Sequence, residues 1–406
     1  MMFYKYNPKT NHYEKPIYFR FFAICGLTSC SDNSDSNYEE IPSYPYVEAE
    51  FGSSVDSNNL ANYANQQVPS YIIKNNSQGN VITDKGATLG RILFYDKNLS
   101  SNNTISCSSC HKQEFAFSDS NVASTGVNGT TGRHSMRLIN SRFATETKFF
   151  WNERALNLET QTTMPIKDHG EMGFSGENGD LSFDDLITKL SAIGYYKELF
   201  KFVYGTEEIT EVKIQSALAQ FIRSIQSFDS KYDAGRALAT NDGQPFSNFT
   251  AQENQGKNLF LSPPVFNTSG VRTSGGLGCA GCHRAPEFDI DPNTLNNGII
   301  GTIAGTGIDT GNTRAPSLRD LVRTDGTTNG PMMHTGVITT LQAAIGHYGT
   351  INIAPGNNNL DPRLTPGGIG QQLNLTAPEV NAVIAFLRTL SGTDVYTNAK
   401  WSNPFN

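Results

Sequence analysis

The chain has 406 residues, of which 17% are charged and 37% hydrophobic, and its formal net charge is −7. This length suffices for a buried core and fits one large domain or two of ordinary size. The sequence has no basic stripe typical of nucleic-acid binding and no run of about 18 apolar residues typical of a membrane-spanning helix. Few charges combined with many aromatic residues also argue against a disordered chain.

The first 30 residues predict an export signal. They carry a net charge of +3, followed by a short apolar run at 21–27 and by small residues that lead to Cys30. This order is typical of a lipobox, in which the cysteine becomes lipid-modified. We therefore expect a lipoprotein-type signal at 1–30 and an exported protein, periplasmic or tethered to a membrane surface through Cys30. An ordinary secretory leader or a misplaced start codon is the alternative.

Residues 31–70 predict an acidic flexible tether. They hold seven acidic residues and no basic one, interspersed with Asn, Ser and Pro. Such a composition is typical of a solvated linker. The folded part is then expected to divide near 240–247, giving one domain at 71–243 and a second at 244–406.

The folded part reads as mostly α-helical. Apolar residues recur at helical spacing over 84–95 and 211–228, and capping boxes at Ser182, Thr250 and Thr376 each precede a further helix. Strand signals are scarce. Long irregular loops rich in Gly, Asn, Ser and Thr connect the helices, chiefly at 118–132, 267–281 and 293–313. Loops of this length are unusual unless functional, and we expect them to wrap a large planar cofactor.

Four of the six cysteines form two Cys-x-x-Cys-His motifs. The first consists of Cys107, Cys110 and His111, and the second of Cys279, Cys282 and His283. Two thiols one turn apart can add to the two vinyl groups of a haem and hold the next histidine under the iron. Zinc would not require a histidine after both pairs, and a thioredoxin-like motif requires a βαβ context that is absent. The motifs predict two covalently bound haem c groups, one in each half.

Seven stretches, in the family's order, resemble the bacterial dihaem cytochrome c peroxidase family, including its methylamine-utilisation branch. They lie at 89–96, 99–111, 150–154, 158–161, 165–172, 314–319 and 333–336. The resemblance implies two cytochrome c-like domains with one haem each. It further implies that the haem on His111 is the peroxidatic centre and that the haem on His283 is the electron-transfer centre.

The resemblance also implies the catalytic residues. Gln161 and Glu171 match the distal-pocket pair of the family, and Trp151 matches the tryptophan between the haems. Cleavage of peroxide needs a group that takes a proton from one oxygen and returns it to the other, which a carboxylate can do and an amide cannot. Glu171 is therefore expected to be the acid–base group, with Gln161 orienting the peroxide. His169 could assist, although a solvated loop histidine is the favoured interpretation.

The sequence departs from the family at the first haem. The distal histidine found in many relatives falls near Val127, which cannot bind iron, so we expect this haem to be open without reductive activation. His134 matches a family asparagine associated with an interdomain calcium ion. It is a displaced distal ligand, a replacement near calcium or, as favoured, a structural histidine. Calcium prefers oxygen ligands, so this exchange weakens the calcium prediction and leaves Asn329 and the Pro331 carbonyl as tentative ligands.

A second departure concerns the other haem. The family's axial methionine position holds Tyr348, with His347 beside it, which resembles the arrangement in the methylamine-utilisation enzyme. A methionine ligand raises the potential of a haem, whereas an oxygen or imidazole ligand lowers it. We expect Tyr348 to be the sixth ligand, with His347 as the alternative. Met332 and Met333 are nearby substitutes, but both precede His334.

The leading expectation is a cytochrome-c peroxidase, an oxidoreductase that reduces hydrogen peroxide to water. Its electrons would come from a small donor protein, a cytochrome c or a cupredoxin. The alternatives are a dihaem oxidase that modifies a protein or organic substrate and a non-catalytic dihaem electron carrier. We expect two haem c groups, tentatively one calcium ion, no nucleic-acid partner, and membrane contact only through a lipid on Cys30. Relatives often form dimers, so a homodimer is compatible with the resemblance.

Overall fold

The computed structural model describes residues 43–290 and 294–405. The predicted signal, the lipid site at Cys30 and the tether residues 31–42 lie outside the described residues. No helix in the described part of the chain is both long and apolar enough to cross a membrane.

The described residues are mostly helical with few strands, as expected. The α-helices are α1 (Pro45–Phe51), α2 (Asp84–Tyr95), α3 (Cys107–Cys110), α4 (Leu158–Thr163), α5 (Phe183–Ser191), α6 (Gly194–Tyr204), α7 (Glu211–Ser224), α8 (Lys231–Arg236), α9 (Ala251–Leu261), α10 (Leu341–Gly349) and α11 (Ala377–Arg388). The strands form two short antiparallel pairs, β1 (Pro264–Phe266) with β2 (Arg272–Gly275) and β3 (His283–Arg284) with β4 (Asp289–Ile290). Short 3-10 turns lie at Gly52–Ser54, Lys97–Leu99, Gln113–Phe115, Cys279–Gly281, Pro362–Leu364, Pro366–Gly368, Asp394–Tyr396 and Ala399–Trp401.

The predicted helix starts are confirmed. Helix α2 has the expected bounds, and the capping boxes at Ser182, Thr250 and Thr376 all form. Helix α7 ends at Ser224, four residues before the predicted end. The reason is competition for backbone hydrogen bonds, because the Ile225 carbonyl accepts from the Asn140 amide at 2.9 Å and the chain leaves the helix there.

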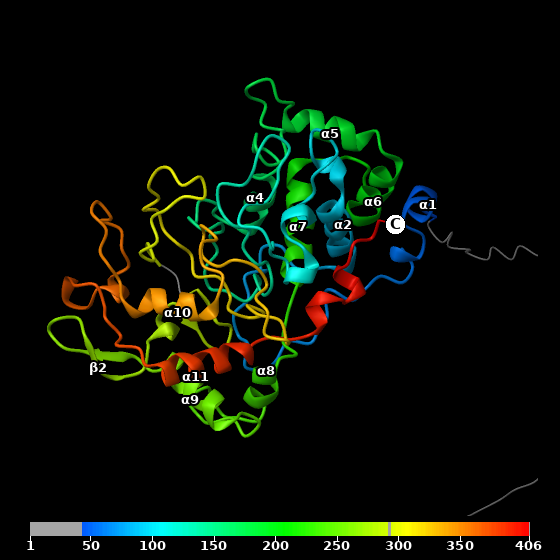
Figure 1. Ribbon diagram of the computed structural model, residues 1–406. Coiled ribbons are helices and arrows are strands. Elements are labelled where there is room, and N and C mark those ends of the chain that lie inside the picture. Colours follow the sequence, from blue (N-terminus) through cyan, green and yellow to red (C-terminus); the bar gives the residue numbers. More distant parts are fainter. Residues whose placement is uncertain (1–42, 291–293, 406) are drawn as a thin grey trace, which may run out of the picture. The chain divides into compact units, whose positions relative to one another are not determined.

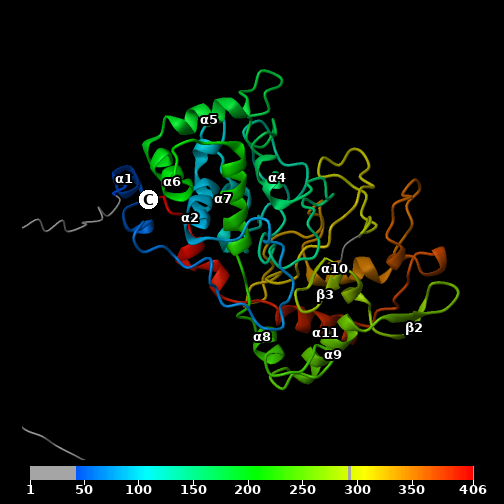
Figure 2. The same ribbon diagram turned by 180° about the vertical axis from the view of Figure 1, so that it is seen from behind.

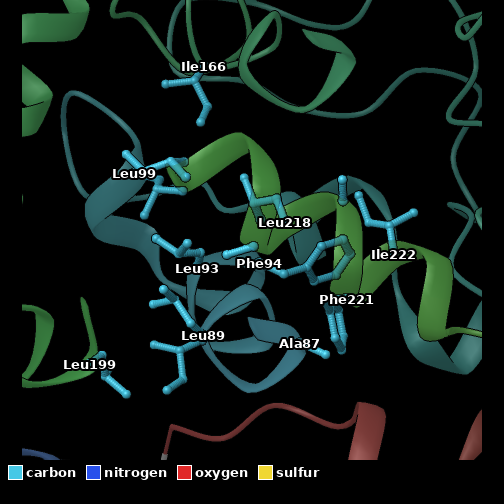
Figure 3. Close-up of a cluster of buried hydrophobic side chains, with 14 of the residues drawn as sticks. Ala87, Leu89, Leu93, Phe94, Leu99, Ile166, Leu199, Leu218, Phe221 and Ile222 are labelled. Atoms are coloured by element: carbon cyan, nitrogen blue, oxygen red, sulfur yellow. The ribbon is translucent and has the colours of Figure 1, made fainter. Parts of the chain in front are cut away.

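The first hydrophobic core lies around the crossing of α2 and α7 (Figure 3). At the crossing, Gly90 lets the two backbones touch, because a Cβ on this residue would lie 2.0 Å from the Ala217 carbonyl oxygen and 2.7 Å from Phe221. Leu89, Phe94 and other side chains of α2 fill the space beside the crossing. The helices are thus fixed at close range by one residue without a side chain.

The second hydrophobic core repeats this arrangement with α9 and α11, which lie side by side in both views (Figures 1 and 2). A Cβ on Gly256 would lie 1.8 Å from the Ala382 carbonyl oxygen and 2.9 Å from Phe386. Glycine, alanine and phenylalanine therefore recur at matching places in the two helix pairs. No repeat beyond the two Cys-x-x-Cys-His motifs is visible in the sequence, because a repeat carried by three separated residues is too sparse to recognise.

The tether prediction is wrong for residues 44–70. Val47 and Phe51 of α1 are buried in the first core, and so is Tyr63. The Glu198 carboxylate accepts hydrogen bonds from the backbone amides of Tyr46 and Val47, and in this way it caps the start of α1. The prediction relied on the average polarity of the segment. A few buried aromatic side chains are enough to hold a polar segment against a folded core.

The end of the chain returns to the first core. Val395 and Trp401 are buried there, whereas Tyr232 belongs to the second core. Arg91 of α2 donates from Nε to the Ser402 carbonyl at 2.6 Å, and Tyr95 donates to the Trp401 carbonyl at 2.7 Å. The division of the chain near residue 243 into two domains stays a prediction.

Candidate functional site

The first Cys-x-x-Cys-His motif forms a single helical turn. Helix α3 begins after Ser106, whose side chain and that of Ser109 form a capping box, and it ends at Cys110. His111 follows as the C-cap residue and donates its backbone N–H to the Cys107 carbonyl at 2.9 Å. The two thiols and the imidazole are thereby presented by five consecutive residues.

His111 has the environment of a metal-binding imidazole. Its Nδ1 lies 3.1 Å from the Phe117 carbonyl oxygen, which can only accept a hydrogen bond, so Nδ1 carries the proton and Nε2 keeps its lone pair. Phe117 has a φ of 58°, which turns its peptide toward the ring. Burial lowers the pKa of His111, and the carbonyls of Phe117 and Met136 oppose this effect. A neutral ring with a free Nε2 fits the proximal ligand of a haem.

The second motif repeats these features in part. Cys279 opens a 3-10 turn and His283 opens β3, followed by Phe288 with a φ of 55°. Burial lowers the pKa of His283 to about 4, and the backbone carbonyls of Phe288 and Pro316 act in the opposite direction by raising this pKa. Unlike His111 Nδ1, the buried His283 Nδ1 has no hydrogen-bond partner in the described part of the chain, so the two histidines share the motif but not this hydrogen bond.

A cavity of about 1530 Å³, its opening included, surrounds the second motif. Cys279, Cys282 and His283 lie on its wall. Most of the remaining wall is apolar, with Phe260, Leu277, Leu318, Leu341, Ile345, Leu373, Val383 and Leu387. A large apolar cavity with two thiols and a neutral imidazole on its wall fits a covalently attached porphyrin.

Tyr348 and His347 face different surroundings. Tyr348 of α10 lines the cavity, and burial raises the pKa of its hydroxyl, with smaller effects from Cys282 and Asn297. His347 is turned elsewhere, since its Nε2 lies 2.9 Å from the Asn297 carbonyl oxygen. Met333 also reaches the cavity, and its sulfur accepts from Asn297 Nδ2 at 3.5 Å. Of the two predicted sixth ligands, only Tyr348 is on the cavity wall.

Glu171 lies beside the first motif. The backbone amides of Gly170 and Glu171 donate to Asp168 Oδ1 at 2.9 and 3.0 Å, which shapes the loop that carries Glu171. Burial raises the pKa of Glu171 to about 7, the Asp168 carboxylate adds to this, and Arg154 opposes it. Glu171 is also near enough to add to the burial-driven rise in the pKa of the Cys107 thiol. The structure therefore gives the predicted acid–base residue a pKa suited to both taking up and releasing a proton.

Val127 is a neighbour of Glu171. Its backbone amide donates to the Glu171 carbonyl at 3.0 Å. Gly126 allows this approach, because a Cβ there would lie 2.1 Å from the Gly170 carbonyl oxygen. The position expected to hold a distal histidine thus lies next to Glu171 and carries a side chain that cannot bind iron.

The other two predicted polar residues are placed differently from Glu171. Gln161 is half-buried on α4, and no hydrogen bond joins its side chain to Glu171 among the described residues. His169 lies at the surface with half of its side chain exposed (50%), and its Nδ1 is 2.8 Å from Asp180 Oδ2. This placement agrees with a solvated loop histidine, whereas the role of Gln161 stays a prediction.

Trp151 is buried and connected to both motifs. Its Nε1 donates to the His134 carbonyl at 2.7 Å, and its own carbonyl accepts from the Arg314 amide at 2.7 Å. Its indole lines the cavity of the second motif. Met136 lies two residues beyond His134, and its backbone carbonyl raises the pKa of His111 in the first motif by hydrogen bonding. The chain at 134–136 therefore links Trp151 to the first motif.

Both ring nitrogens of His134 face atoms of the protein. Its Nδ1 is 3.0 Å from the Asn121 carbonyl oxygen and its Nε2 is 3.4 Å from Ser118 Oγ. Burial lowers its pKa to about 4. These contacts favour the structural interpretation of His134.

Asn329, a tentative calcium ligand, already has partners. Its Oδ1 accepts from Arg323 Nε at 3.1 Å, and its Nδ2 donates to the Asp320 carbonyl and to Tyr396. No group of three or more His, Cys, Asp or Glu residues in the described part of the chain is arranged to hold a metal ion.

Sequence reasoning missed three arginines that line the cavity, Arg137, Arg314 and Arg363. Only Arg314 lies in a stretch that resembles the family. No local pattern indicates the other two, because they reach the cavity from segments far from the second motif in sequence.

Comparison with known proteins agrees with this geometry. A sequence model described as "Di-haem cytochrome c peroxidase" matches residues 84–241. The methylamine utilization protein MauG of Methylorubrum extorquens is 29% identical over 282 residues, covering 67% of this chain and 70% of that protein. The cytochrome c551 peroxidase of Nitrosomonas europaea is 27% identical over 321 residues, covering 75% and 80%.

Solved structures show the same fold. A MauG-like protein associated with microbial copper homeostasis has a TM-score of 0.63 and 28% identity, covering 84% of this chain and 99% of that one. The diheme peroxidase BthA of Burkholderia thailandensis has a TM-score of 0.60 at 20% identity, covering 80% and 91%. In its two motifs, its cavity and these similarities, the chain resembles di-haem cytochrome c peroxidases.

Proposed function

We propose that the protein is a dihaem c-type peroxidase that reduces hydrogen peroxide to water. Its two electrons come from a small redox protein, a cytochrome c or a cupredoxin. The observation that carries this proposal is Glu171, a carboxyl beside the first motif with a pKa raised to about 7. A non-catalytic electron carrier has no need for such a group near an iron.

The residues divide the work as follows. Cys107, Cys110 and His111 would hold one haem, and the second motif would hold the other. When bound, the haems would supply the iron that takes up peroxide and would store electrons. Glu171 takes the proton from the inner peroxide oxygen and delivers it to the outer one, which leaves as water. Its pKa near the working pH keeps both protonation states accessible. Gln161 orients the peroxide, and Trp151 shortens the path for electrons between the motifs.

The test is peroxide turnover by Glu171→Gln. We expect the fully haem-loaded variant to lose about 10²-fold or more in kcat, because the amide cannot move a proton. Glu177→Gln, an exposed change in the following loop, is the matched control and should retain activity. Pyridine haemochrome spectra establish two haems per chain in each sample. Near-full turnover by the Glu171 variant would remove this residue from the mechanism.

Tyr348 favours a second candidate, a dihaem oxidase that acts on a protein or organic substrate. A tyrosine oxygen as sixth ligand lowers the potential of the second haem relative to methionine and favours oxidised states of the iron. Near-infrared spectra distinguish the ligands, since a methionine-to-iron charge-transfer band would exclude Tyr348. Oxidation of added protein in preference to a reduced cytochrome donor would favour the oxidase over the peroxidase.

We further propose an exported protein with a lipid on Cys30, two cytochrome c-like domains at 71–243 and 244–406, and a homodimer. Mass spectrometry of the mature N-terminus tests the anchor, and an unmodified Cys30 would refute it. A calcium ion near Asn329 and Pro331 stays a prediction, and binding would require Asn329 to give up its contact with Arg323.

A further inference from the structure

The three arginines that line the cavity of the second motif differ in their charge partners. Arg314 Nη2 lies 3.6 Å from Asp289 Oδ2, and Arg363 Nη2 lies 2.8 Å from Asp361 Oδ2. Among the residues that the structure describes, no carboxylate lies within 4.0 Å of Arg137. Two of the three cations on the wall are therefore paired within the protein, and Arg137 is not.

Arg137 is a buried cation with few contacts. Its Nη2 donates to the Ser317 carbonyl at 3.0 Å, and its Nε is buried without a hydrogen-bond partner. Burial lowers its pKa to about 10, so the guanidinium keeps its charge at neutral pH. The negative charge of Asp320 raises the pKa of Arg137, but the two side chains lie too far apart to form an ion pair. A buried charge held by one carbonyl is costly unless a further partner supplies negative charge.

We propose that Arg137 binds a carboxylate of the haem held by Cys279, Cys282 and His283. This inference rests on the proposed function, because it takes a haem to be the occupant of the cavity. A haem c carries two propionate carboxylates into a cavity whose wall is otherwise mostly apolar. The planar fork of a guanidinium matches a carboxylate in shape and charge.

Arg137 lies next to a segment that contacts the first motif. Arg137 follows directly on the 134–136 segment that links Trp151 to the first motif. The segment that touches His111 thus also supplies a binding residue to the cavity of His283. A fixed positive charge in this low-dielectric site favours the iron state with less positive charge. Arg137 therefore raises the reduction potential of the second haem.

The test is the reduction potential of each haem in purified Arg137→Gln with two haems per chain. We expect the equilibrium constant for reduction of the second haem to fall tenfold or more, which is 59 mV for a one-electron couple. The first haem should keep its potential. Resonance Raman bands of propionate bending should shift as well. If Arg137 only donates to Ser317, the glutamine leaves the potential and these bands unchanged, and the inference fails.

Two further variants complete the test. Arg142→Gln removes a half-buried arginine five residues on that is not on the cavity wall, and it should leave both potentials unchanged. Arg137→Lys keeps the charge and loses the fork, so the potential should stay within about threefold of wild type in equilibrium constant while the Raman bands shift. Where Arg137→Gln takes up no second haem, unchanged bands in loaded Arg137→Lys overturn the inference.

The outcome for this inference is separable from that for the proposed function. A wild-type protein without haem at the second motif would end the proposed function. Two haems per chain with potentials insensitive to Arg137 would end only the assignment of Arg137. Peroxide turnover is therefore not a readout in this experiment.

Discussion

At the scale of single residues, the environment of Glu171 is what makes this chain suited to acid–base chemistry. Three influences act on its pKa, namely burial, the negative charge of Asp168, and the positive charge of Arg154. Burial dominates and disfavours the charged form, so the carboxyl titrates near neutral pH instead of near 4.5. The two neighbouring charges can be removed one at a time, which makes their effects measurable.

Removing these charges should move the pH profile in opposite directions. Glu171 accepts a proton only when ionised, so kcat/KM should rise with pH through about 7 in the wild type. Asp168→Asn removes a negative charge, lowers the pKa of Glu171 and moves this limb to lower pH. Arg154→Gln raises the pKa of Glu171 and moves the limb to higher pH. Stopped-flow peroxide kinetics between pH 5 and 9 measure both shifts, with exposed Asp184→Asn as an unshifted control. A common direction in both variants would contradict the electrostatic explanation.

Asp320 is a second residue whose environment opposes its charge. Its Oδ1 accepts from the Gly392 amide at 2.9 Å and from Tyr396 at 3.2 Å, while its Oδ2 is buried without a partner. Burial raises its pKa to about 6. Asn140 has a similar left-handed backbone, with φ values of 56° for Asn140 and 49° for Asp320. Both ends of the Asn140 side-chain amide form hydrogen bonds, because Nδ2 donates to the Ser227 carbonyl and Oδ1 accepts from the Ser227 backbone amide.

Asp320→Asn should stabilise the protein only at higher pH. A carboxyl whose pKa is raised on folding contributes stability below its unfolded pKa and loses that contribution as pH rises through the folded value, here about 6. The asparagine variant does not titrate, so its free energy of unfolding should exceed that of wild type by roughly 3 kcal/mol at pH 8 and match it at pH 4.

Urea unfolding of the two proteins at both pH values measures this difference. Asn140→Asp is the reciprocal variant and should lose stability at pH 8 relative to pH 4. An advantage of Asp320→Asn that is equal at the two pH values would show that ionisation is not its cause.

At the scale of elements, two helix crossings position the two motifs. The pair α2 and α7 and the pair α9 and α11 each meet where a glycine faces an alanine carbonyl. Both crossings are closed to any side chain, because a Cβ would lie about 2 Å from the facing oxygen. Each motif follows the first helix of its pair in sequence, so a displaced crossing would displace the motif.

A methyl group at either crossing should therefore destabilise its core. Gly90→Ala and Gly256→Ala should each cost about 1–3 kcal/mol or more, because the facing atoms belong to the backbone and cannot turn away. Gly346→Ala on α10 is the control, since no atom lies within 4 Å of its Cβ and alanine favours the helix by up to about 1 kcal/mol. Thermal unfolding of the holoprotein measures all three. A melting temperature of Gly90→Ala equal to that of wild type would show that the helices can separate without cost.

At the scale of the described part of the chain, arginine side chains tie distant segments together. Arg323 donates from Nη2 to the Glu114 carbonyl at 2.7 Å and from Nε to Asn329, which joins the loop after the first motif to the loop before α10. Arg133 binds Asp309 in the same manner, with Nη2 2.5 Å from Oδ2. Guanidinium groups thus connect segments that are far apart in the sequence.

Chelation should consequently leave the protein active. We expect purified protein treated with EDTA to keep its peroxide turnover and melting temperature, because Arg323 already engages the Asn329 amide oxygen. Elemental analysis before and after treatment measures the calcium content. Loss of turnover that added calcium restores would establish the ion and would require Asn329 to exchange its partner.

Features that depend on neighbouring residues can be predicted from the amino-acid sequence alone. Both haem motifs, the helix starts at Ser182, Thr250 and Thr376, and the mostly helical class follow from local spacing and capping chemistry. The resemblance to the family singled out Glu171, which lies near Cys107 of the first motif, and its catalytic role stays a prediction.

Features that depend on residues far apart in the chain become visible only in the folded molecule. Tyr63 is buried although its segment is polar on average, Tyr348 faces the cavity while His347 turns away, and Arg137 reaches the second motif from the segment that touches the first. The physical reason is that burial, electrostatic environment and unpaired charge are properties of packed surroundings. No local pattern encodes which distant backbone or side chain will fill the space around a residue.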